Sequence, residues 1–150
     1  MILLLFGQPG AGKTTLATAL KDSIPVGDNA PAVIHIDGDR WREVTRNKDY
    51  SREGRIRNLK GAFDMALYLE REGFTVILSF VTPYAELRDH LRSHSRSYRE
   101  VWLTYQGDRG RNSFFVPDFE APGEEVLTLD TSVLSPMECI DRLLPLIRNA

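Results

Sequence analysis

Residues 7–15 read GQPGAGKTT and fit the phosphate-binding pattern G-x-x-x-x-G-K-[ST]. Glycines let the backbone curl around a phosphate, so that successive N–H groups face the anion. In this pattern the amine of Lys13 reaches the β- and γ-phosphates of ATP, and the hydroxyl of Thr14 is a ligand of Mg²⁺. The sequence therefore predicts ATP and Mg²⁺ as cofactors. The predicted cradle comprises Gly7, Gly10, Ala11, Gly12, Lys13, Thr14 and Thr15.

A pair of carboxylates follows the second apolar run of the chain. Asp37 and Asp39 come directly after residues 32–36, AVIHI. Two carboxylates just past a strand can hold a Mg²⁺-bound water or accept a proton from an attacking hydroxyl. A tight turn is the alternative interpretation, and the phosphate-binding motif favours the catalytic one. We therefore expect Asp37 and Asp39 to be catalytic together with Lys13, with Asp37 also a metal ligand.

The elements that must position these residues alternate between strands and helices. Strand-like runs occur at residues 1–6, 32–36, 74–80, 100–105 and 126–129. Helical patterns occur at residues 16–20, 51–72, 84–94 and 135–147, with Pro83 suited to a first turn and Ser135 to an N-cap. Residues 106–123 are predicted to form a long loop. The alternation predicts an α/β fold, with a five-stranded parallel sheet flanked by helices on both faces, as one domain over residues 1–150.

The phosphate-binding motif lies where this architecture requires it, between the first strand and the first helix. A glycine-rich turn with a chance lysine is the alternative, and that flanking context argues against it. Ligands of such sheets bind at the carboxyl ends of the strands. His35 lies within the second strand, where packing is its expected role.

Composition and charge indicate the cellular compartment of the protein and the kind of ligand it binds. No apolar run approaches the ~20 residues of a membrane span, and the only cysteine, Cys139, lies in an apolar helical pattern. We expect an intracellular, cytoplasmic protein without a membrane partner, in the host cytoplasm if a phage encodes it. The net charge is −2, yet residues 40–60 hold eight basic and three acidic side chains. This basic stretch indicates either an anionic second substrate or a solvated helix face.

Three further motifs carry a family resemblance. Residues 37–42 read DGDRWR, residues 51–58 read SREGRIRN, and residues 79–84 read SFVTPY, with Arg88 and Arg92 after them. Together with the phosphate-binding motif they resemble the D-G-D-x-x-R, S-x-x-x-R-x-x-N and S-F-[IV]-[ST]-P-[YF] motifs of the adenylylsulfate kinases. Those P-loop enzymes phosphorylate the ribose 3′-hydroxyl of adenosine 5′-phosphosulfate. The resemblance covers about residues 2–95.

This resemblance implies an acceptor site. Its residues would be Arg42, Arg55, Asn58, Phe80 and Thr82. The arginines and the asparagine would hold the phosphate-like group of the acceptor, and Phe80 would pack on its base. Thr82 stands where the family has a serine that is described as a phosphorylated intermediate. Direct in-line transfer does not require that step.

The resemblance fades after the fourth strand. The family has a basic lid there, whereas this chain passes almost directly into residues 106–115, QGDRGRNSFF. We expect Arg109 or Arg111 of this shortened loop to stabilise the transferring phosphoryl group. The later residues 118–122, DFEAP, resemble the acidic E-x-P stretch of the family. Without the full lid, the acceptor side should be more open.

Three functions follow, and the first is the one we favour. It is the transfer of the γ-phosphate of ATP to a hydroxyl of an anionic, nucleotide-like small-molecule acceptor. The second is a kinase of a hydroxymethylated base, of the 5-hydroxymethyluracil type, in modified phage DNA, although a net charge of −2 is unusual for a DNA-binding protein. The third is a non-catalytic nucleotide-binding module. A homodimer is left open.

The DNA alternative assigns specific roles to the cations and aromatic side chains in and near the basic stretch. The cations would track a phosphate backbone, and an aromatic side chain would stack on a base. The cations are Arg40, Arg42, Arg46, Lys48, Arg52 and Arg57, and the aromatic candidates are Trp41, Tyr50 and Tyr84.

Overall fold

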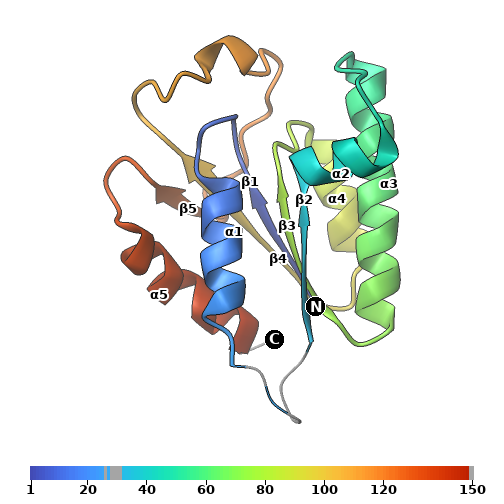
Figure 1. Cartoon of the computed structure of the whole chain (residues 1–150), viewed down its shortest axis with the longest axis vertical. Helices are drawn as coiled ribbons and strands as arrows, with labels where there is room; N and C mark the ends of the chain where they lie inside the picture. The colour runs from blue at the N-terminus through green and yellow to red at the C-terminus, as the bar shows by residue number, and fades with distance from the viewer. Residues whose placement is uncertain (26, 28–31, 149–150) are drawn as a thin grey trace.

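The computed structural model describes residues 1–25, 27 and 32–148 of the chain. Five parallel strands form a sheet in the order β2-β3-β1-β4-β5 (Figure 1). They are β1 (Ile2–Phe6), β2 (Val33–Asp37), β3 (Thr75–Phe80), β4 (Tyr98–Thr104) and β5 (Leu127–Asp130). The predicted α/β fold with a five-stranded parallel sheet is confirmed.

Helices cover both faces of this sheet (Figure 1). The helices α1 (Lys13–Asp22) and α5 (Pro136–Arg148) pack on one face, and α3 (Arg52–Arg71) and α4 (Ala85–His94) pack on the other. The central strand β1 is fully buried, because Leu3 and Leu5 point to the first layer while Leu4 and Phe6 point to the second. The apolar run at the start of the sequence is therefore a strand covered on both sides, as parallel sheets require.

Local signals fix the ends of the two longest helices. The hydroxyl of Ser51 caps α3 by accepting a hydrogen bond from the N–H of Gly54 at 3.1 Å, and Gly73 ends the following turn with a φ of 92°. At α5 the Glu138 carboxylate accepts from the N–H of Ser135, while the Ser135 hydroxyl accepts from the N–H of Glu138. This reciprocal pair is a capping box and confirms the predicted start of the helix.

Four details of the predicted element list need correction. Residues 38–45, which were not predicted to be helical, form α2 (Gly38–Thr45). Pro83 lies outside α4, because Tyr84 is the N-cap and the helix starts at Ala85. The strand β4 begins two residues before the predicted start, and the long loop contains a short 3₁₀ helix, η1 (Asn112–Phe114). None of the helices in the described part of the chain is long and apolar enough to cross a membrane.

Candidate active site

Residues 7–12 connect β1 to α1 and border a cleft of about 820 Å³. Gly10 and Gly12 have φ angles of 86° and 89°, which residues with a side chain rarely adopt. Gly7 passes so close to β4 that a Cβ there would lie 2.1 Å from the carbonyl oxygen of Leu103. The backbone path of this P-loop therefore needs the glycines of the motif. Most of the predicted cradle lines the cleft, namely Gly10, Gly12, Lys13, Thr14 and Thr15, whereas Gly7 and Ala11 do not line it.

Lys13 lies across the P-loop. Its Nζ donates a hydrogen bond to the carbonyl oxygen of Gln8 at 2.8 Å. Burial, together with the nearby positive charge of Arg111, lowers the pKa of Lys13 to about 8 against the attraction of Asp39 and Asp37. An anion bound in the P-loop would reverse this, because a negative charge favours the protonated amine. Within the described residues Lys13 forms no ion pair, and its side chain lines the cleft.

Asp37 ends β2 and is almost fully buried. Its Oδ2 accepts hydrogen bonds from the hydroxyls of Thr14 at 2.6 Å and Ser79 at 2.9 Å. Its Oδ1 accepts from the N–H groups of Asp39 and Arg40, both at 3.2 Å, and so caps α2. Burial alone would raise the pKa of Asp37, but these hydrogen bonds outweigh burial and lower it. Asp37 is therefore a weak base that stays ionised.

The pairing of Thr14 and Asp37 fits a Mg²⁺ site. Both supply oxygen atoms, which Mg²⁺ prefers, and the two side chains already meet beside the P-loop. The described residues hold no group of three or more His, Cys, Asp or Glu side chains that could bind a metal by themselves. That agrees with the usual behaviour of Mg²⁺ at nucleotide sites, where one or two protein ligands combine with water and phosphate oxygens.

Asp39 differs from Asp37 in its surroundings. It lies in the first turn of α2, is exposed and lines the cleft. Among the described residues, no side chain or N–H donates a hydrogen bond to its carboxylate. The two carboxylates that the sequence presented as a pair therefore have distinct environments. One is saturated with donors and the other is free to accept a proton.

The residues of the predicted acceptor site line the same cleft, and they come from α2, α3 and the segment at the end of β3. Two buried polar atoms there, Oδ1 of Asn58 and the hydroxyl oxygen of Thr82, find no hydrogen-bond partner among the described residues. Thr82 is fully buried and has an unusual positive φ of 43°. Phe80 is 3% exposed and packs edge-on against Phe63, so only a small part of its ring reaches the cleft.

The two arginines predicted to bind the acceptor differ in availability. Nη1 of Arg42 donates to both oxygens of Asn47 and to the carbonyl oxygen of Asp49, and the guanidinium covers the ring of Tyr50 at 4.2 Å. Arg55 lines the cleft, and its guanidinium makes no hydrogen bond or ion pair within the described residues. Arg55 is thus the cation on this wall that is available for an anionic ligand.

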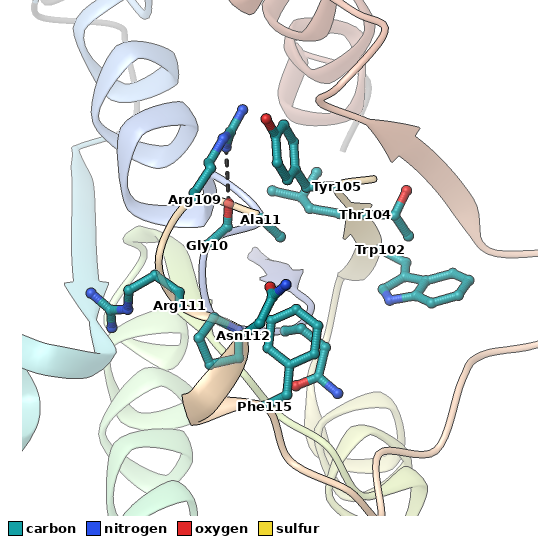
Figure 2. Close-up of a pocket in the computed structure, with 12 residues that line it drawn as sticks. Gly10, Ala11, Trp102, Thr104, Tyr105, Arg109, Arg111, Asn112 and Phe115 are labelled. Carbon is teal, nitrogen blue, oxygen red and sulfur yellow. Dashed lines mark hydrogen bonds between the residues drawn. The ribbon is translucent and has the colours of Figure 1, made fainter. Parts of the chain in front are cut away.

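The segment after β4 folds over the P-loop, and we call residues 105–116 the roof loop. Arg109 donates from Nη1 to the carbonyl oxygen of Gly10 at 2.9 Å and stacks on Tyr105 at 3.7 Å (Figure 2). Arg111 points in a different direction from the same segment and lines the main cleft (Figure 2). A smaller pocket of about 170 Å³ remains between the roof loop, the P-loop and the end of β4. Hydrogen bonds from Arg109 and Val116 to P-loop residues hold the roof loop against the P-loop.

Three contacting residues of this region were missed by sequence reasoning. Gln8 joins the P-loop to the roof loop through its amide, and Thr131 donates from its hydroxyl to the carbonyl oxygen of Ala11 at 3.0 Å. Ser79 holds Asp37. Ser79 and Thr131 lie at or just past the carboxyl ends of strands. That position was a usable signal for both. The sequence holds no comparable signal for Gln8, because its partner Val116 lies 108 residues away.

The acidic stretch at residues 118–122 ties the end of the long loop to α4. The Glu120 carboxylate accepts from the N–H of Ala85 at the start of that helix. Arg88 donates to the carbonyl oxygens of Thr82 and Glu120, at 3.0 and 2.8 Å. Arg88 therefore supports the backbone behind the cleft and does not line it.

Comparison with known proteins places the chain among related kinases. Residues 1–110 match the family model described as adenylylsulphate kinase. A probable adenylyl-sulfate kinase of Pseudomonas aeruginosa is 34% identical over 103 residues, which are 68% of this chain and 47% of that protein. The cytidine diphosphoramidate kinase of Campylobacter jejuni is 30% identical over 102 residues, which are 68% of this chain and 59% of that protein. The chain thus spans about half the length of the curated relatives it matches.

The fold is shared with solved structures of the same group. The Mycobacterium tuberculosis APS kinase, in complex with AMPPNP and APS, matches with a TM-score of 0.78 at 19% identity, covering 98% of this chain and 96% of that one. At that identity the likeness concerns the fold alone. The family match includes the P-loop, the carboxylate pair and the cleft wall formed by α3. The chain belongs to the adenylylsulphate kinase family.

Proposed function

We propose that this protein is an ATP-dependent phosphotransferase that moves the γ-phosphate of ATP to a hydroxyl of an anionic, nucleotide-like acceptor. The observation that carries the proposal is one cleft with two unlike walls. Lys13 and the carboxylate pair stand on the P-loop side, and Arg55 and Asn58 stand on the other. Relatives named as adenylyl-sulfate kinases and a cytidine diphosphoramidate kinase support it.

The donor side would hold the triphosphate. The N–H groups of the P-loop and the start of α1 suit the β- and γ-phosphates, and Lys13 adds a positive charge. Thr14 and Asp37 would hold Mg²⁺, which neutralises charge on the phosphate oxygens. Arg111 lines the cleft near Lys13 and would neutralise charge on the transferring group. Phosphoryl transfer needs mainly this positioning and charge neutralisation.

The acceptor hydroxyl would lose its proton to Asp39. Asp37 is a poor candidate because four donors already occupy its oxygens. As the new bond forms between the acceptor oxygen and the γ-phosphorus, the bond from that phosphorus to the β-phosphate oxygen breaks and ADP leaves. Thr82 takes no part in this direct transfer, and its fully buried hydroxyl is poorly placed to meet the γ-phosphate.

The acceptor would place its phosphate-like group against Arg55 and its base near Phe80. Asn58 lines the same part of the cleft and would contribute its amide to the ligand. Adenylylsulfate is the acceptor that the family resemblance puts first. Its anionic phosphosulfate group and its nucleoside match the cation and the apolar surface of this wall.

The contacts of the basic stretch favour a small acceptor over modified DNA. Arg42 is engaged within its own loop, and Arg52 pairs with Asp118 at 2.8 Å. Tyr84 is fully buried, so the expectation that it could stack on a base is wrong. Trp41 is partly buried and donates to the carbonyl oxygen of Asn58. Two of the six cations expected to follow a phosphate backbone are therefore engaged within the chain, and two of the three aromatic candidates are part of the cleft wall or the core.

A labelled-phosphate assay tests the proposal directly. The protein is incubated with radiolabelled ATP and either adenylylsulfate or duplex DNA carrying 5-hydroxymethyluracil. Saturable label on adenylylsulfate, with none on DNA, is the expected result. Label on DNA alone would move the assignment to the second acceptor. ATP hydrolysis that neither acceptor affects would contradict the proposal.

A further inference from the structure

A chain of hydrogen bonds runs from His35 to the P-loop. Nε2 of His35 lies 2.8 Å from the hydroxyl oxygen of Ser79, which in turn donates to Oδ2 of Asp37 at 2.9 Å. The hydroxyl of Thr14 donates to the same Oδ2 at 2.6 Å. Four side chains from β2, β3 and α1 are thus linked in one row beside the phosphate site.

Counting hydrogens fixes the direction of the row. A serine hydroxyl has a single proton, and Ser79 donates that proton in its hydrogen bond to Asp37. The contact between Ser79 and His35 can then be a hydrogen bond only if Nε2 of His35 carries the proton and donates it. His35 therefore directs the hydroxyl proton of Ser79 toward the carboxylate.

The strands place these groups without strain. Residues two apart on a strand share a face, so β2 puts His35 and Asp37 on the same side. In the parallel ladder Ser79 of β3 is the register partner of Asp37, and the imidazole reaches diagonally across to it. His35 is only half-buried, so packing alone gives no reason for its nitrogen to meet a hydroxyl.

We propose that His35 is a positioning residue that acts through Ser79 to hold Asp37 in the orientation that binds Mg²⁺. The inference rests on the proposed function, since it concerns the metal that accompanies ATP. Partners of a ligating carboxylate fix its orientation and contribute to metal affinity even though they do not touch the metal. With His35 in place, Oδ2 of Asp37 keeps its position beside Thr14.

The test compares three variants in ATP binding and in turnover. His35→Leu removes the donor, His35→Gln keeps an N–H at a similar reach, and Ser79→Ala removes the link. Calorimetric titration with ATP, with and without Mg²⁺, measures how much the metal strengthens binding. We expect that gain to fall on the order of tenfold in His35→Leu and Ser79→Ala and to be largely restored in His35→Gln. ATP affinity without metal should stay at the wild-type level in all three.

A double variant separates a relay from a local packing effect. If His35 acts only through Ser79, then His35→Leu combined with Ser79→Ala should lose no more than Ser79→Ala alone. The matched control is His94→Leu, because His94 is exposed and bonds only within its own helix. In turnover, the Mg²⁺ concentration for half-maximal rate should rise in His35→Leu, with kcat at saturating Mg²⁺ close to wild type.

The outcomes separate this inference from the function beneath it. If wild-type protein gains no ATP affinity from Mg²⁺, the proposed function fails and the inference with it. A normal wild-type gain that His35→Leu leaves unchanged overturns the inference alone. So does an equal loss with and without metal, or losses that simply add in the double variant, because either shows a structural effect that does not run through Asp37.

Discussion

Gln8 and Val116 are joined by a pair of hydrogen bonds between the P-loop and the roof loop. Nε2 of Gln8 donates to the carbonyl oxygen of Val116, and the N–H of Val116 donates to Oε1 of Gln8, both at 2.9 Å. A side-chain amide thus pairs with a backbone as a neighbouring strand would. Because Val116 is buried, this pair anchors the far end of the roof loop where it leaves the phosphate site.

Replacing Gln8 should loosen the roof loop. Gln8→Ala removes both bonds and leaves the Val116 N–H and carbonyl without these partners. Trypsin cuts after arginine, so cleavage after Arg109 and Arg111 should become several-fold faster, and ATP affinity should fall by about tenfold, as for a lost hydrogen bond of about 1 kcal/mol or slightly more. Gln106→Ala is the control, since Gln106 bonds to Asp130 and does not reach the P-loop. Unchanged cleavage in Gln8→Ala would show that other contacts anchor the loop.

Lys13→Ala should remove phosphoryl transfer while leaving the fold intact. The amine faces the cleft, and its lowered pKa of about 8 shows that burial disfavours its charge in the absence of a ligand. Its loss should therefore cost little stability, whereas turnover should drop by about a hundredfold or more. Steady-state rates and thermal unfolding measure the two effects, with Lys21→Ala in the same helix as the control. Activity within about tenfold of wild type would contradict the kinase assignment.

The two carboxylates should give different kinetic signatures. Asp37→Asn keeps an oxygen to cap α2 but loses the charge beside Thr14, so the Mg²⁺ requirement should rise. Asp39→Asn should lower kcat by about a hundredfold or more, as expected for a lost general base, with the Mg²⁺ requirement unchanged. Turnover measured across a range of Mg²⁺ concentrations distinguishes them. If Asp39→Asn retains full turnover, another group accepts the proton.

Much of this arrangement follows from the sequence because it depends on local patterns. The apolar run of β1, the glycines of the P-loop and the Ser135 cap each identify an element from a few adjacent residues. The helix α2 was missed because it is short, buries no residue fully and has only two large apolar residues, Trp41 and Val44. Its signal was the capping aspartate, Asp37, which was interpreted as a ligand or a base, with a tight turn as the alternative.

The roof loop and the hydrogen-bonded row at Asp37 could not be predicted in the same way. Their contacts join residues far apart in the chain, such as His35 with Ser79 and Arg109 with Gly10. Such pairs follow no period and depend on the register of finished strands. The difference in hydrogen bonding between Asp37 and Asp39 also depends on the folded sheet, because only the fold brings Ser79 and Thr14 to the carboxylate of Asp37.

Glu70 should make the stability of the fold depend on acid pH. Its buried carboxylate accepts hydrogen bonds from the Ser95 hydroxyl at 2.6 Å and from the N–H groups of Arg96 and Ser97 at 3.0 and 2.9 Å. Burial alone would raise the pKa of Glu70, but these donors outweigh burial and lower it. A depressed pKa stabilises the fold above the unfolded value of about 4.3, and this contribution is lost as the pH falls through the folded value.

Glu70→Gln tests that contribution. The variant should lose about 1 to 3 kcal/mol of unfolding free energy at neutral pH and should show a shallower decline between about pH 5 and pH 3 than wild type. Urea unfolding at a series of pH values measures both. The control is Glu72→Gln, because Glu72 is exposed at the end of the same helix. Parallel pH profiles for wild type and Glu70→Gln would assign the acid dependence to other groups.

Arg55 and the exposed cations of the basic stretch should separate a small acceptor from DNA. Arg55→Ala should raise the acceptor KM by about tenfold or more with little change in the KM for ATP, because its guanidinium lines the acceptor wall. Arg46→Ala and Lys48→Ala are the matched controls, being exposed and outside the cleft.

For a small anion the acceptor KM should rise only mildly with salt. For a DNA acceptor the logarithm of the affinity, taken as 1/KM, would instead fall against the logarithm of the salt concentration with a slope of about −0.7 to −0.9 for each phosphate engaged, and both controls would make that slope shallower. Since Arg42 and Arg52 are already engaged within the chain, we expect the shallow slope and unaffected controls.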